Sequence, residues 1–84
     1  MYFFATGHVS DPGELGRYLD EEKRVLAELR EEGVVRDAFS PAGGHGVISF
    51  LEGPSLQDVQ AQLARLPFVA HGLLTFDYTE VVPL

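Results

Sequence analysis

The sequence contains no cysteine, so neither disulfide bonds nor thiolate metal sites can stabilise the fold. Cations are scarce as well: six Lys and Arg residues stand against thirteen Asp and Glu residues, which gives a net charge of -7. A surface that binds nucleic acid needs a basic stripe, and anionic lipid repels an acidic face. We therefore expect neither nucleic acid nor a membrane surface among the partners of this chain.

Long apolar runs are also missing. No stretch approaches the roughly 20 apolar residues that span a bilayer. Residues 1–7 lack the basic start and the long apolar core of a secretory signal peptide, so the predicted location is the cytoplasm. What the chain does have is a hydrophobic content of 45% within 84 residues, which predicts one globular domain over residues 1–84.

Four segments have the composition of β-strands, because apolar, aromatic and β-branched residues dominate them and turn residues bound them. They cover residues 1–9, 34–39, 47–51 and 73–82. The glycine-rich residues 40–46 predict a hairpin loop between the second and third strands, with glycines where the backbone needs a positive φ.

Two segments have apolar residues at helical spacing instead, and they predict helices over residues 14–32 and 56–66. The first carries Leu15, Leu19, Leu26 and Leu29; the second carries Leu56, Val59, Leu63 and Leu66. Gly33 and Pro67 provide the stop signals. Ser10 or Asp11 is expected to cap the first helix, and Ser55 the second.

The resulting order is β-α-β-β-α-β, which predicts a ferredoxin-like α+β fold. Right-handed crossovers place both helices on one face of a four-stranded antiparallel sheet. The other face should then be polar if it met water. Both faces are apolar instead: Tyr2 and Phe4 alternate with Phe3 and Ala5 in the first strand. We therefore expect a homodimer or larger homo-oligomer that buries the second face, as in a dimeric α+β barrel.

Glu22 is the most informative single residue. At 100° per residue it falls in the middle of the leucine stripe of the first helix, where a carboxylate is costly unless it is paired. Desolvation there would raise its pKa, as a general base or acid near neutral pH requires. The alternative is a structural role, in which Glu22 reaches the helix edge or pairs with a partner such as His8 or Tyr18.

The three histidines are far apart in the sequence. His8, at the end of the first strand, is a candidate for proton transfer, with a hydrogen-bonded structural role as the alternative. His45 in the glycine-rich loop and His71 before the last strand are expected to be solvated. Their spacing matches no metal-binding pattern, so we predict neither a metal nor another cofactor.

Several short motifs follow one another along the chain: Glu22-Lys23, Glu28-Leu29, Gly33 and Leu66-Pro67-Phe68. Together with the order of the elements, they resemble muconolactone Δ-isomerase and its small relatives over residues 20–82. The resemblance implies a ferredoxin-like subunit that dimerises through its sheet. It also implies cofactor-free movement of a double bond in an unsaturated lactone, by abstraction and return of a proton.

The resemblance places the Glu-Lys pair of the isomerase on Glu22 and Lys23. Residues 37–40 and 47–49 depart from it, because the isomerase has an aromatic, Arg-bearing strand and an Asn-Tyr-Ser stretch at these places. We expect a small unsaturated lactone, cyclic or enol-type compound as the substrate, rather than muconolactone itself.

The first functional hypothesis is therefore a cofactor-independent isomerase or related proton-transfer enzyme. Glu22 would act as the base, and Lys23 or His8 would stabilise a developing oxyanion. The substrate-binding side chains would be Tyr18, Phe39 and Phe68. Two alternatives stay open: a cofactor-free monooxygenase or cyclase of aromatic polyketide-like compounds, and a non-enzymatic module for ligand binding or assembly.

Overall fold

The computed structural model describes residues 1–44 and 46–84, so His45 lies outside the described residues. The elements are β1 (Tyr2–Val9), the 3-10 helix η1 (Pro12–Tyr18), α1 (Leu19–Glu31), β2 (Val35–Phe39), β3 (Val47–Glu52), α2 (Leu56–Leu63), α3 (Pro67–Ala70) and β4 (Leu74–Val81). The predicted β-α-β-β-α-β order is confirmed. In this part of the chain, no helix has the length and apolarity needed to cross a bilayer.

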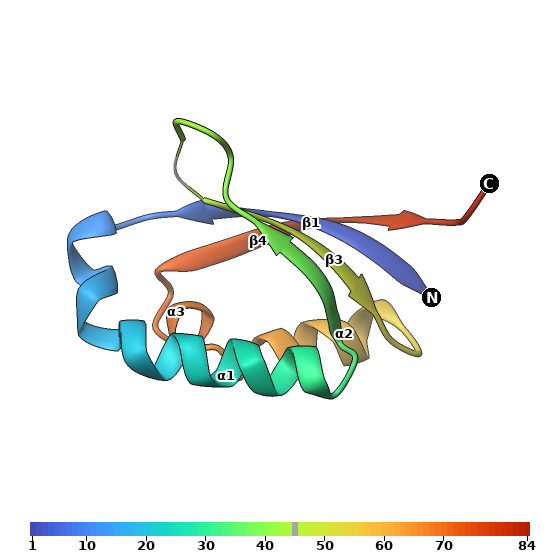
Figure 1. Cartoon of the computed structure of the whole chain (residues 1–84), viewed down its shortest axis with the longest axis horizontal. Coiled ribbons are helices and arrows are strands. Elements are labelled where there is room, and N and C mark those ends of the chain that lie inside the picture. Colours follow the sequence, from blue (N-terminus) through green and yellow to red (C-terminus); the bar gives the residue numbers. More distant parts are fainter. Residues whose placement is uncertain (45) are drawn as a thin grey trace.

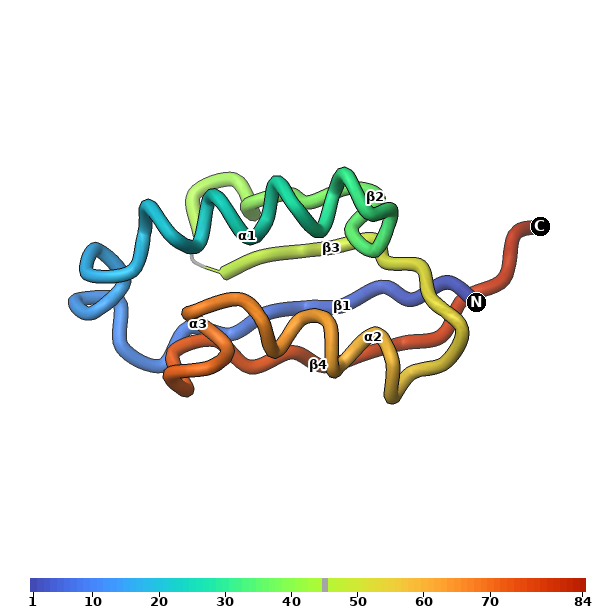
Figure 2. Tube along the Cα trace, turned by 90° about the horizontal axis from the view of Figure 1, so that it is seen from below, coloured from blue at the N-terminus to red at the C-terminus, as the bar shows by residue number. Residues whose placement is uncertain are grey.

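The four strands form one antiparallel sheet in the order β2-β3-β1-β4. The helices lie together on one side of this sheet (Figure 1). Seen from that side, α1 runs beside α2 and α3 across the same face (Figure 2). The ferredoxin-like α+β fold expected from the sequence is confirmed.

The β2–β3 connection is a hairpin loop, as the glycines predicted. Gly43 and Gly46 have φ angles of 71° and 110°, which residues with side chains rarely adopt. A Cβ atom at Gly46 would lie 2.5 Å from the carbonyl oxygen of Gly7 on β1. Glycine at this position thus allows the loop to return against the central strand.

The first helix differs from the prediction, because residues 12–18 form the 3-10 helix η1 and only residues 19–31 are α-helical. Gly13 and Gly16 lie in the first of these segments, and glycine disfavours a continuous α-helix. Neither Ser10 nor Asp11 caps a helix through its side chain; the Ser10 hydroxyl donates instead to the carbonyl oxygen of Gly72 at 3.0 Å. The expected N-terminal cap of the first helix was therefore wrong.

The break also changes which residues of the first helix enter the core. Leu29 is fully buried, with 0% of its surface exposed, whereas Leu19 is 41% exposed and Leu15 is only half-buried. Val25, which the leucine spacing did not single out, is buried beside Leu29. The inner face of α1 is therefore shorter than predicted and begins near Glu22.

The second helix ends earlier than predicted, at Leu63, and the chain then forms the separate short helix α3. The Ser55 cap is confirmed, because its hydroxyl accepts a hydrogen bond from the backbone N–H of Asp58 at 3.1 Å. Pro67 does end the apolar stripe, but it also starts α3, where a residue without an N–H is well tolerated.

The core lies between the helices and the inner sheet face. Its strand residues are Phe3, Ala5, Val35 and Leu51, and its helical and loop residues are Val25, Leu29, Val59, Leu63 and Leu66. Because side chains alternate along a strand, Tyr2 and Phe4 project from the opposite, outer face. The structure thereby identifies the sheet face that the helices leave open.

Candidate active site

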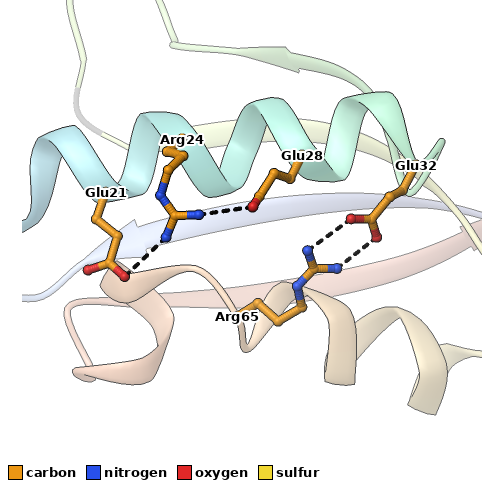
Figure 3. Close-up of polar contacts among 5 residues, drawn as sticks. All are labelled: Glu21, Arg24, Glu28, Glu32 and Arg65. Carbon is orange, nitrogen blue, oxygen red and sulfur yellow. Dashed lines mark hydrogen bonds and ion pairs between the residues drawn. The ribbon is translucent and has the colours of Figure 1, made fainter.

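The outward side of α1 is a network of solvated charges. Arg24 donates hydrogen bonds to Glu21 at 3.4 Å and to Glu28 at 2.9 Å, so these acidic residues pair along the helix (Figure 3). Both glutamates keep substantial exposure, and exposed pairs of this kind contribute little to stability. Glu21 and Glu28 thus have a surface role.

An ion pair joins the end of α1 to the link between α2 and α3. The guanidinium of Arg65 donates to both carboxylate oxygens of Glu32, at 2.7 and 2.9 Å (Figure 3). This bidentate hydrogen bonding lowers the pKa of Glu32. The pair helps to fix the chain two residues before α3 begins.

Glu22 lies on the inner side of α1 and is half-buried. Its Oε1 atom accepts a hydrogen bond from the backbone N–H of Phe68 at 2.9 Å. Phe68 follows Pro67, which has no N–H, and therefore provides the first backbone donor of α3. The expected position of Glu22 is confirmed, but its polar partner is this amide rather than His8 or Tyr18.

Two opposing effects determine the pKa of Glu22. Burial removes water from the carboxylate and raises its pKa, while the hydrogen bond from Phe68 lowers it by a smaller amount, and the net direction is upward. A carboxyl group shifted in this direction is better suited to exchange protons near neutral pH than an exposed one.

Tyr18 and His71 lie next to this pair. Tyr18 is the last residue of η1, one turn before Glu22, and His71 directly follows α3. Their rings stack with centroids 4.2 Å apart and planes 17° from parallel. His71 is exposed, as expected, but its contact with Tyr18 could not be read from the sequence.

His8 and Phe39 lie on the other side of the sheet. His8 Nε2 is 2.9 Å from Asp77 Oδ2, and both side chains are largely exposed. Phe39, at the end of β2, is 57% exposed. A single subunit therefore brings Tyr18, Glu22 and Phe68 together but leaves His8 and Phe39 on the opposite face. Lys23 follows Glu22 on α1 and is exposed.

Two cavities formed by the described residues lie away from Glu22. One, of about 580 Å³, lies between the end of α1 and the start of α2 and includes Glu32, Glu52 and Asp58. The other, of about 240 Å³, lies on the outer sheet face. Its lining residues are Tyr2, Phe4, Phe50, Val81, Val82 and Pro83. Across residues 1–44 and 46–84, no three His, Asp or Glu side chains converge to hold a metal ion.

Comparison with solved structures identifies the fold. Muconolactone isomerase aligns with 100% of this chain and 91% of its own, with a TM-score of 0.81 and 21% sequence identity. A 5-chloro-2-hydroxyhydroquinone dehydrochlorinase from Burkholderia phenoliruptrix, in complex with 2,5-dihydroxybenzoquinone, aligns with 98% of this chain and 94% of its own. Its TM-score is 0.71 at 19% identity. The fold is thus that of muconolactone isomerase, as the sequence motifs predicted.

As a sequence, the chain matches no protein-family model, and it has no significant match to a curated protein. At these identities the structural comparisons show a shared fold.

The raised pKa of Glu22 predicts how stability depends on pH. A carboxyl group with a raised pKa binds its proton more tightly in the folded state than in the unfolded state. Its contribution to stability is complete below the pKa of the unfolded state, near 4.5, and is lost as the pH rises through the pKa of the folded state. Glu22→Gln keeps an oxygen acceptor for Phe68 but cannot ionise. We expect the free energy of unfolding of this variant to be higher than that of the wild type at neutral pH. At low pH the two values should be equal.

Glu22→Ala is the matched comparison, because it leaves the Phe68 amide without its acceptor. We expect it to lower the free energy of unfolding by about 1 kcal/mol. Urea titrations of the three proteins across the acid-to-neutral range measure both effects. A Gln variant that is less stable than the Ala variant at neutral pH would contradict the hydrogen-bond assignment.

Proposed function

We propose that this chain is a cofactor-independent isomerase, or a related proton-transfer enzyme, for a small unsaturated lactone, cyclic or enol-type compound. The observation that carries the proposal is the Glu22 carboxylate: half-buried, held at one oxygen by the Phe68 amide, and raised in pKa. The cytoplasm, as the sequence predicts, is the proposed location.

The hydrogen bond at Glu22 involves Oε1, which leaves Oε2 to accept a proton. In the proposed reaction, Glu22 removes a proton from a carbon next to a carbonyl group, and the C–H bonding pair passes into an enolate. The same proton then returns to the other end of the conjugated system, so the double bond moves. The overall change is redox-neutral and needs no group beyond a base and a donor to the enolate oxygen.

Neighbouring side chains provide the remaining roles in this proposal. Tyr18 and Phe68 flank Glu22 and would contact a flat ring, while Lys23 would lend positive charge to the developing oxyanion. His8 and Phe39 lie on the opposite face of the sheet, so the proposed reaction within one subunit does not use them.

The two solved structures support the class of substrate. One is named for a lactone and the other for a hydroxylated ring, and the second contains the planar compound 2,5-dihydroxybenzoquinone. A fold hosts many chemistries, so this support is an analogy. The proposal for this chain therefore names a small oxygenated ring and no individual compound.

The test uses α-angelica lactone, a small unsaturated lactone with exchangeable protons next to its carbonyl group. In heavy water, NMR follows both proton exchange and movement of the double bond. We expect the wild type to accelerate exchange and Glu22→Gln to reduce the enzymatic rate by about 100-fold or more, because the base is lost.

Glu21→Gln is the control for that experiment, since it removes a carboxylate of the same helix that pairs with Arg24 at the surface. Its exchange rate should equal that of the wild type. Equal rates for the wild type and Glu22→Gln would remove Glu22 from the mechanism and contradict the proposal.

We also propose that the outer sheet face is buried against a second copy of the chain. Phe4 is 45% exposed on this face, and its ring lies 5.1 Å from that of Phe50, which also stacks with Tyr2 at 5.5 Å. Exposed aromatic clusters of this kind are typical of association sites. A two-fold pair would bury the cluster against itself.

Phe4→Glu tests this assembly, because it places a charge at the centre of the aromatic cluster and leaves the core side of β1 unchanged. Sedimentation should give twice the subunit mass of 9.2 kDa for the wild type and the single mass for the variant. Leu56→Glu is the control, since Leu56 is 38% exposed on the helical side, and it should remain dimeric. A wild type that sediments as a monomer at micromolar concentration would contradict the proposal.

A further inference from the structure

Two successive contacts join the start of α1 to α3. The first is the hydrogen bond between the Phe68 amide and Glu22, and the second is the stack of Tyr18 on His71. Tyr18 and Glu22 are four residues apart, and Phe68 and His71 are three apart, so each pair spans about one helical turn. Both contacts therefore lie where η1 and α1 meet α3, and they bring His71 and Glu22 to the same junction.

The backbone on both sides of His71 is also fixed. Its N–H donates to the carbonyl oxygen of Pro67 at 2.9 Å, and the chain then turns at Gly72, which has a φ of 71°. The Ser10 hydroxyl donates to the Gly72 carbonyl at 3.0 Å. The ring face rests on half-buried Tyr18, while the residue as a whole is exposed. Its position is thus set by the fold, while the residue stays exposed to solvent.

We infer that His71, positioned by Tyr18, is a further functional side chain of the Glu22 site and donates a hydrogen bond to the oxygen of an enolate. This inference rests on the proposed function. When Glu22 takes the proton from carbon, the electron pair of the C–H bond moves onto the carbonyl oxygen. The N–H of His71 stabilises that oxygen until Glu22 returns the proton to the ring.

This assignment uses the one histidine that the fold brings to the Glu22 side of the sheet among the described residues. His8 shares its outer face with Asp77, whose carboxylate oxygen lies 2.9 Å from its Nε2. The ligand of this site would be the enolate itself. An enolate is flat and anionic, and in the reaction it coexists with a protonated Glu22, because Glu22 has just taken the proton from carbon. An ionised Glu22 would repel the enolate.

Tetronic acid is a suitable probe, since it is a small enolic lactone and an anion at neutral pH. Glu22→Gln mimics the protonated carboxyl group, so this variant should bind tetronate about tenfold more tightly than the wild type. Adding His71→Gln to that variant should weaken binding about tenfold, the effect of losing a hydrogen bond to a charged group. Adding His8→Gln instead, the same change on the opposite sheet face, should leave the affinity as it was.

NMR titration with tetronate at neutral pH gives the dissociation constants, and thermal melts show that each variant is folded. Tyr18→Leu in the Glu22→Gln background should also weaken binding, because it removes both the stack on His71 and a ring proposed to contact the ligand. If adding His71→Gln leaves the affinity unchanged, His71 has no such role, whatever the effect of Tyr18→Leu, while the tighter binding of Glu22→Gln still supports the proposed function. If Glu22→Gln binds no better than the wild type, the enolate site itself is wrong, and this inference is overturned with it.

Discussion

A carboxylate on the buried side of a helix needs a donor, and in this protein the donor is a backbone amide of another helix. The 2.9 Å hydrogen bond from Phe68 to Glu22 is possible because Phe68 lies in the first turn of α3, where backbone N–H groups have no partner within the helix. It ties α3 to α1 at the one polar group on the inner side of α1. The Arg65–Glu32 ion pair fixes the same connection from the other end. The candidate active site is therefore a contact between helices, with the sheet as its support.

The sheet contributes by having two different faces. Phe3, Ala5 and Leu51 bury one face under the helices and so determine where α1 and α3 can lie. The outer face carries Phe4 and Phe50, which are not needed for the core of a single subunit. Along each strand, alternate residues thus form the core of the subunit and the proposed interface between subunits. A substitution on one face can be made without removing a side chain from the other, which allows the two roles to be studied separately.

The order of elements was predictable because its signals are local. The glycines of residues 40–46 marked the hairpin, and Ser55 with Asp58 marked the start of α2. The boundary between η1 and α1 was missed, because the leucine spacing continues through Gly16 although the backbone changes its type of helix. In that case backbone preference prevailed over apolar periodicity.

The site was predictable only in part, for a related reason. Helical periodicity placed Glu22 on the core side, but a partner that is a backbone amide leaves no residue type to recognise in the sequence. Pro67 was the available sign, because proline is common at the first position of a helix and the N–H groups of a first turn have no partner within the helix. The stack of Tyr18 on His71 joins residues far apart in the chain, and the alternation that separates His8 from Glu22 requires knowing which strand face meets the helices.

The central claim is that Glu22 is a half-buried carboxylate, bonded to the Phe68 amide, with a raised pKa. NMR tests it directly by following the carboxyl-carbon signal of Glu22 and the amide signal of Phe68 as a function of pH. We expect both signals to titrate with one common midpoint, at a pH above the ordinary glutamate pKa of 4.5. A Glu22 midpoint at or below that value, or a Phe68 amide that does not respond to the titration of Glu22, would contradict it.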